Sequence, residues 1–109
     1  MLDGVFAYND PLAIGAMQAI LGAGLRIPED IRLIGCGNLF FDSSLRVPLS
    51  SIDQNSRAIG EHAASILLNI LESKVRPEPL TVILEPSLVA RASSTRLKLG
   101  LRGCAEDLD

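Results

Sequence analysis

Aromatic residues are scarce in this sequence. Tryptophan is absent, and Phe, Tyr and Trp together make up 4% of the 109 residues. Hydrophobic residues nevertheless account for 48% of the chain, so its apolar content consists mainly of Ile, Leu, Val and Ala. Those residues typically fill parallel sheets covered by helices, and a share of this size is enough for a packed core. The composition therefore favours an open, layered α/β fold and argues against disorder.

Positive charge is also in short supply. Ten Lys and Arg against 13 Asp and Glu give a formal net charge of -3 and a pI near 5.0. Binding to the phosphate backbone of a nucleic acid requires a surplus of basic residues. We therefore expect that this chain does not bind DNA by itself.

The residues of metal sites, disulfide frameworks and catalytic motifs are few and badly spaced. Cys36 and Cys104 form no Cys-x-x-Cys pair, and His62 has no nucleophile or metal ligand at a useful spacing. The sequence contains no GxGxxG, GxSxG or P-loop motif. We expect a protein that is not an enzyme and that holds no metal or cofactor, in a reducing cytoplasm.

Long hydrophobic runs are missing as well. No apolar stretch approaches the roughly 20 residues that cross a bilayer, and the first residues lack the basic start of a signal peptide. We expect no contact with a membrane. The opening residues lead directly into a strand pattern, as they would if the chain began partway through a larger fold.

The first part of the sequence has the pattern of a β-α-β unit. Residues 4–8 are β-prone, Asp10 and Pro11 fit a helix start with Asp10 as its cap, and Gly24 fits a left-handed helix end. Residues 31–36 predict the next strand, parallel to the first. Ligands of such sheets bind at the carboxyl ends of the strands, where residues 8–10 and 36–38 would lie side by side.

The second part is predicted with less regular elements. We expect a loop over 39–48 with one helical turn near 42–45, an extended link over 50–54 and an amphipathic helix over 56–73. Two prolines make 75–79 a linker, and 81–84 and 88–92 are strand candidates. From about residue 95 we expect a mobile tail.

Several segments, taken in their order along the chain, resemble the C-terminal part of LacI/GalR-type repressors, whose sensing core has the two-lobed fold of type I periplasmic binding proteins. The match runs from about Asp3 to Ser94. It is carried by Ala7-Tyr8-Asn9-Asp10 with Ala13 and Gly15-Ala16, Gly24-Leu25-Arg26-Ile27-Pro28-Glu29-Asp30-Ile31, Leu33-Ile34-Gly35, Pro48-Leu49-Ser50-Ser51-Ile52-Asp53-Gln54 and Leu88-Val89-Ala90-Arg91-Ala92-Ser93-Ser94.

The resemblance implies a partial sensor domain over residues 1–94, with residues 95–109 as a flexible tail. It places the last two crossings between lobes near 49–54 and 74–80, and it implies that the helix over 56–73 packs on the other lobe. It further implies a sugar-like small effector that controls operator binding allosterically, a homodimer or higher homo-oligomer, and DNA binding only through a headpiece that this chain lacks. The alternatives are a periplasmic sugar-binding protein of an ABC-type transporter and, from another class, a small α/β enzyme.

Five residues are candidates for contact with the effector, and each has a competing structural role. Asp10 can simply cap its helix, Asn38 can stabilise a turn, Phe40 can pack the loop, and Gln54 can be solvated. The full set is Asn9, Asp10, Asn38, Phe40 and Gln54. Many relatives carry an acidic residue where Gly37 stands, so the sugar or base specificity of the family does not transfer directly.

The resemblance also implies a dimer interface formed by the first helix and the loop after the second strand. The candidates are Leu12, Ile14, Met17, Leu45 and Val47. Ile14 and Leu45 are preferred for subunit contact, because some of these side chains must instead fill the core.

Overall fold

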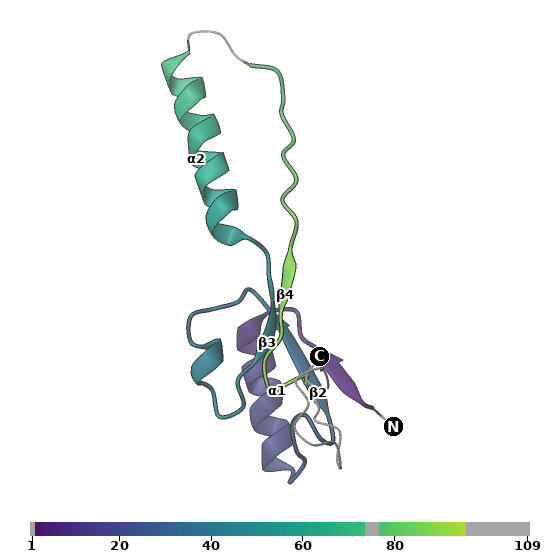
Figure 1. Ribbon diagram of the computed structural model, residues 1–109. Coiled ribbons are helices and arrows are strands. Elements are labelled where there is room, and N and C mark those ends of the chain that lie inside the picture. Colours follow the sequence, from purple (N-terminus) through teal and green to yellow (C-terminus); the bar gives the residue numbers. More distant parts are fainter. Residues whose placement is uncertain (1, 74–76, 96–109) are drawn as a thin grey trace, which may run out of the picture.

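The chain forms a small sheet-and-helix body from which a long arm projects (Figure 1). The computed structural model describes residues 2–73 and 77–95. Its elements are β1 (Gly4–Phe6), α1 (Asp10–Gly22), β2 (Arg32–Cys36), the 3-10 helix η1 (Asp42–Ser44), β3 (Ser50–Asp53), α2 (Ser56–Glu72) and β4 (Ser87–Val89).

The four strands form one sheet in the order β1-β2-β3-β4. The pairs β1–β2 and β2–β3 are parallel, and β4 runs antiparallel to β3. The predicted parallel β-α-β unit and the α/β fold class are confirmed. The prediction that residues 50–54 are only an extended link is wrong, because residues 50–53 form β3, an inner strand of the sheet.

Buried serines explain why β3 does not have the pattern of a strand. Ser50 and Ser51 are fully buried, where a sequence pattern would require apolar side chains. Ser50 Oγ accepts a hydrogen bond from the Arg91 backbone N–H at 2.7 Å, and Ser51 Oγ donates one to Asp10 Oδ1 at 2.8 Å. Because each hydroxyl has partners, the cost of burying it is offset.

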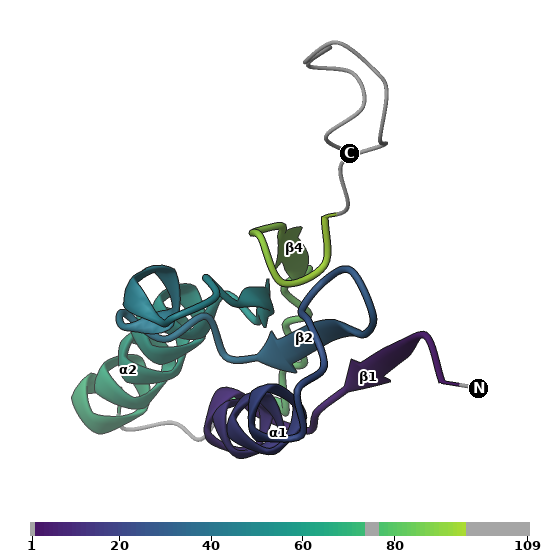
Figure 2. The same cartoon turned by 90° about the horizontal axis from the view of Figure 1, so that it is seen from below.

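The core lies between α1 and the sheet. Figure 2 shows α1 on one side of β1 and β2. The most buried apolar residues are Ala7, Ala13, Met17, Ile27, Leu33 and Leu49. Met17 is 3% exposed and belongs to this core, which was the competing role for this dimer-interface candidate.

Helix α1 begins and ends for local reasons. Its N-cap is Asn9, whose Oδ1 accepts a hydrogen bond from the Leu12 backbone N–H at 2.9 Å. The predicted cap, Asp10, is instead the first helical residue, followed by Pro11 in the first turn. Gly24, just beyond the helix, has φ 81°, which confirms its left-handed conformation.

The arm consists of α2 and the extended segment 77–86, which runs back beside it to β4 (Figure 1). The predicted helix over 56–73 is confirmed to within one residue. The strand predicted over 81–84 is wrong, because these residues join no ladder in the described part of the chain. The arm gives the molecule extents of 65 × 31 × 26 Å.

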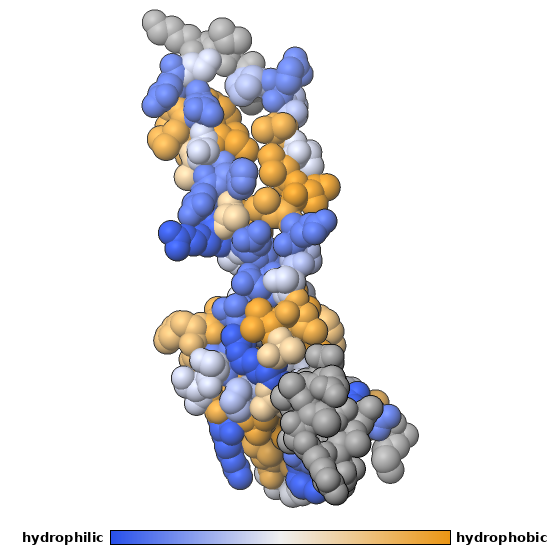
Figure 3. All heavy atoms as spheres, in the orientation of Figure 1, coloured by the Kyte–Doolittle hydropathy of each residue, from blue (hydrophilic) through white to orange (hydrophobic). Residues whose placement is uncertain are grey.

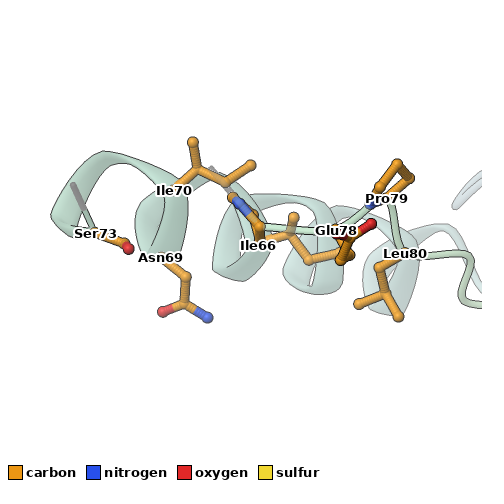
Figure 4. Close-up of a pocket in the computed structure, with 8 residues that line it drawn as sticks. Ile66, Asn69, Ile70, Ser73, Glu78, Pro79 and Leu80 are labelled. Atoms are coloured by element: carbon orange, nitrogen blue, oxygen red, sulfur yellow. The ribbon is translucent and has the colours of Figure 1, made fainter. Parts of the chain in front are cut away.

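Apolar side chains lie open along the arm, as the orange surface in Figure 3 shows. No residue between Ser56 and Glu72 is buried. Figure 4 shows how Ile66 and Ile70 of α2 and Leu80 of the returning segment line a groove of about 640 Å³. The arm therefore has an apolar surface that residues 2–73 and 77–95 leave uncovered.

Candidate functional site

Three parallel strands bring their carboxyl ends to the same edge of the sheet, which is where ligands bind in open α/β folds. We call this the carboxyl edge. It consists of residues 8–10 after β1, residues 37–42 after β2 and residues 53–54 at the end of β3. All five predicted effector-contacting residues lie on it.

Asp10 is fully buried and ties the carboxyl edge together. Its Oδ2 accepts a hydrogen bond from the Leu39 backbone N–H at 3.0 Å, and its Oδ1 accepts one from Ser51 Oγ at 2.8 Å. In this arrangement both of its oxygens are occupied by the protein. Asp10 thus connects α1 to the loop after β2 and to β3.

Asp42, at the start of η1, is equally buried and lies against Asp10. Its Oδ2 accepts from the same Leu39 N–H at 3.1 Å, so the two carboxyl groups share one backbone donor. Arg91 Nη1 lies 3.9 Å from Asp42 Oδ2. Neither Asp42 nor Arg91 was a predicted site residue.

Burial and mutual contact push the pKa values of the two carboxyl groups apart. Burial, followed by the hydrogen bond to Asp10 and the repulsion of its charge, raises the pKa of Asp42 to about 7. Burial also acts to raise the pKa of Asp10, but hydrogen bonds from Asp42, Leu39 and Ser51 outweigh it and leave that pKa below its ordinary value. The pair therefore tends to hold one proton.

Asn38 is held by the protein on both sides of its amide. Its Nδ2 donates to Asp53 Oδ2 at 3.2 Å, and its Oδ1 accepts from Arg91 Nη2 at 2.8 Å. Its backbone N–H donates to Ser51 Oγ at 2.9 Å, and its φ is 51°. These bonds fit the turn-stabilising role that was the alternative for Asn38.

Arg91 completes this arrangement from just after β4. Its Nη1 donates to the Leu49 backbone carbonyl at 2.7 Å while Nη2 contacts Asn38. Sequence reasoning missed this role because Arg91 was visible only as part of a strand pattern. The available signal was a single cation among apolar residues at the end of that pattern.

Two glycines permit the close approach of Asp10 to the sheet. A Cβ on Gly35 would lie 2.2 Å from Asp10 Oδ1, so no larger residue fits there without a shift. Gly37 has φ 126°, a conformation that residues with a side chain rarely adopt. Any residue with a side chain would be strained at this position in the present loop.

The remaining surface of the carboxyl edge is neutral and partly aromatic. Tyr8 is 84% exposed and Phe40 is 92% exposed, although the ring of Phe40 meets that of Phe41 edge to face at 5.3 Å between centroids. Gln54 Nε2 donates to Cys36 Sγ at 3.1 Å. Asn9 uses its Oδ1 as the helix cap, so its amide N–H group is the part that can donate to a ligand.

The dimer-interface candidates divide between surface and core. Leu12 is exposed, and Val47 is partly buried against the core. Ile14 and Leu45 line a groove of about 390 Å³ between α1 and the loop after β2. These positions leave both preferred contact residues within reach of a partner.

Within residues 2–73 and 77–95, no three His, Cys, Asp or Glu side chains gather where they could hold a metal ion. In the same part of the chain, no helix is long and apolar enough to span a bilayer.

Comparison with known proteins gives consistent matches over most of the chain. Residues 2–94 match the model of the periplasmic binding protein-like domain family. The HTH-type transcriptional repressor PurR of Aliivibrio fischeri (strain ATCC 700601 / ES114) is 38% identical over 95 residues, which are 86% of this chain and 28% of that repressor. PurR of Vibrio vulnificus (strain CMCP6) is 38% identical over 87 residues, covering 80% of this chain and 26% of the repressor.

Solved structures agree with these relatives. The transcriptional regulator CelR in complex with cellobiose aligns with a TM-score of 0.78 and 27% identity, over 84% of this chain and 28% of that one. A LacI family transcriptional regulator from Arthrobacter sp. FB24 in complex with lactose aligns with a TM-score of 0.76 and 33% identity, over 84% and 34% of the two chains. The present chain thus spans 26–34% of the length of these four proteins.

Proposed function

Because the chain belongs to the periplasmic binding protein-like domain family and is similar to LacI-type transcriptional regulators, we propose that its carboxyl edge forms part of a site for a small neutral effector, such as a sugar. Effector binding there would control DNA binding by another part of a longer, dimeric regulator.

The observation that carries this proposal is that the carboxylates of the carboxyl edge are already hydrogen-bonded within the protein. Asp10, Asp42 and Asp53 all direct carboxylate oxygens to donors of the protein itself. What remains at the surface is the amide of Asn9, the amide of Gln54 and exposed aromatic rings. Neutral donors and acceptors beside aromatic faces suit a neutral polyhydroxylated ligand better than a charged one.

Two of the similar structures support the same ligand class. CelR was solved with cellobiose, and the Arthrobacter regulator with lactose. The transporter alternative is not favoured, since the similar proteins named above are transcriptional regulators. The same relatives argue against a catalytic role.

Calorimetry on the full-length protein tests the proposal. Cellobiose, lactose, a nucleobase and an amino acid should be titrated in turn, and we expect heat of binding with a saccharide. Asn9→Asp keeps the capping oxygen but removes the amide donor, so it should weaken that binding at least about tenfold, which corresponds to roughly 1.4 kcal/mol. Glu29→Gln, an exposed acid outside the site, is the matched control. Unchanged affinity in Asn9→Asp, or binding of charged ligands only, would contradict the proposal.

A further inference from the structure

The contact between Asp10 and Asp42 poses a problem of charge. Both side chains have 0% exposure, and the Oδ2 atoms of Asp10 and Asp42 accept from the same Leu39 N–H group. Asp42 Oδ1 is buried and has no hydrogen-bond donor among the described residues. A buried carboxylate oxygen without a donor is costly, and two adjacent carboxylates cannot both be ionised cheaply.

The charged and titratable groups around Asp42 do not remove this problem. Asp10 faces it from the start of α1, and Arg91 faces it from the segment after β4 at 3.9 Å. Arg91 also directs its guanidinium to the Leu49 carbonyl and to Asn38 at shorter distances, 2.7 and 2.8 Å. One cation at this distance cannot neutralise two buried anions.

A single proton resolves both difficulties. If Asp42 is protonated, its hydroxyl becomes a donor for the Asp10 carboxylate, while its other oxygen still accepts from Leu39 N–H. An O–H···O⁻ bond of this kind is among the strong hydrogen bonds of proteins. The pair then carries one negative charge, which Ser51 Oγ and Leu39 N–H stabilise from the Asp10 side.

We propose that Asp42 is a positioning residue, which fixes the loop 37–42 at the carboxyl edge through a proton that it shares with Asp10. The pair connects this loop to α1 and, through Ser51, to β3. The Leu49 backbone N–H also donates to the Asp42 carbonyl at 2.9 Å, so the same residue anchors the far end of the loop. Loss of the proton should loosen the loop.

The proton can be tested directly on the 109-residue chain by NMR of 13C-labelled aspartate carboxyl groups. We expect the Asp42 resonance to titrate at least about 1.5 pH units above an ordinary aspartate, and the Asp10 resonance to titrate below one. Titration of both groups at ordinary pH values would overturn the proposal. Assignment comes from Asp42→Asn, in which the upper titration step should vanish.

Asp42→Asn also tests the positioning role, because its amide can donate to Asp10 without a titrating proton. In the wild-type chain, protection of the Leu39 N–H from hydrogen exchange, corrected for the intrinsic pH dependence, should fall as the pH rises from 5 to 8. In Asp42→Asn this protection should stay constant over the same range. Asp42→Ala, which offers no donor, should show low protection throughout. Equal protection in all three chains would show that the pair does not hold the loop.

A third measurement connects the loop to ligand binding, and it alone rests on the proposed function. In the full-length protein, affinity for the bound saccharide should fall as the pH rises from 5 to 8, and this fall should be absent in Asp42→Asn. The NMR titration needs no ligand, so a protein that binds no saccharide would contradict the proposed function and leave the shared proton standing. An equal fall in saccharide affinity in the wild-type protein and in Asp42→Asn would show that the shared proton does not influence ligand binding through the loop.

Discussion

At the scale of single residues, Asp42 should give folding stability an unusual dependence on pH. Its pKa in the folded chain is about 7, against an ordinary 3.8, so between these values the folded state binds more protons than the unfolded state. Its contribution is complete below pH 3.8 and is lost as the pH rises toward 7. The pKa of Asp10 is lowered, so its contribution has the opposite sign and is lost as the pH falls below 3.8.

The two effects together predict a chain that is most stable near pH 4 and less stable at pH 7. The free energy of unfolding should fall by up to about 1.4 kcal/mol per pH unit over this interval, the limit for one titrating group. Urea denaturation at pH 4, 5, 6 and 7 measures it. Asp42→Asn should flatten the curve, Glu29→Gln should not, and a wild-type curve that rises steadily to pH 7 would refute the prediction.

Gly35 should tolerate no side chain. In Gly35→Ala the new Cβ would meet Asp10 Oδ1 at 2.2 Å, and also Leu49 Cδ2 and Ala13 Cβ at 3.2 and 3.3 Å. Both oxygens of Asp10 are fixed by hydrogen bonds, so we expect a loss of about 1–3 kcal/mol. The control is Gly15→Ala inside α1, where a Cβ meets nothing within 4 Å. That change should raise stability by about 0.5–1 kcal/mol in the same denaturation assay.

At the scale of the secondary-structure element, the stability of α1 should depend on the cap that Asn9 provides. Asn9→Ala removes the acceptor for the Leu12 N–H and should cost about 1 kcal/mol. Asn9→Asp retains the acceptor and should cost much less. Thermal unfolding followed by circular dichroism compares them, and equal losses in the two variants would mean that the cap contributes little.

Elements whose ends have specific chemistry were predictable from the sequence. Pro11 and Gly24 mark the ends of α1, and the apolar pattern of residues 31–36 gives β2. β3 was missed because its buried serines are satisfied by Asp10 and Arg91, partners distant in sequence. Residues 81–84 have strand-like composition but no neighbour to pair with, and pairing is not a local property.

The candidate site was predictable in location but less so in its residue roles. The topology of a β-α-β unit fixes which residues reach the carboxyl edge, and this requires no three-dimensional detail. The exchange of roles between Asn9 and Asp10 depends on a hydrogen bond to Ser51, 41 residues away. The Asp10–Asp42 pair depends in the same way on how the loop folds back onto α1.

At the scale of the whole molecule, the arm should cause the isolated chain to associate. A radius of gyration of 19.1 Å exceeds the roughly 13 Å of a compact domain of this size, and the large apolar side chains of α2 remain open to solvent. They include Ile59, Leu67, Leu68, Ile70 and Leu71. Each is worth about 1.5–3 kcal/mol when fully buried, so covering several of them is a strong driving force. That α2 packs on a further lobe in a longer protein stays a prediction.

Light scattering across a concentration series measures this association. We expect a dimer or a larger assembly, and we expect the double variant Leu67→Glu/Leu71→Glu to shift it toward the monomer. Leu25→Glu, an exposed leucine of the body, is the control and should not change the mass. A species of 11.6 kDa at every concentration in the wild-type chain would contradict the prediction.

The pairing of β3 with β4 also has a mechanical consequence. The arm is joined to the body by two adjacent strands, held in register from Ser51–Val89 to Asp53–Ser87. Such a ribbon resists flexing within its own plane, because that motion would stretch one strand and shear the hydrogen bonds, whereas flexing out of the plane requires only small dihedral changes. We therefore expect the arm to bend more easily out of the plane of these two strands than within it. Asp53, at the base of this ribbon, accepts a hydrogen bond from Asn38, so we expect bending of the arm to displace the loop after β2.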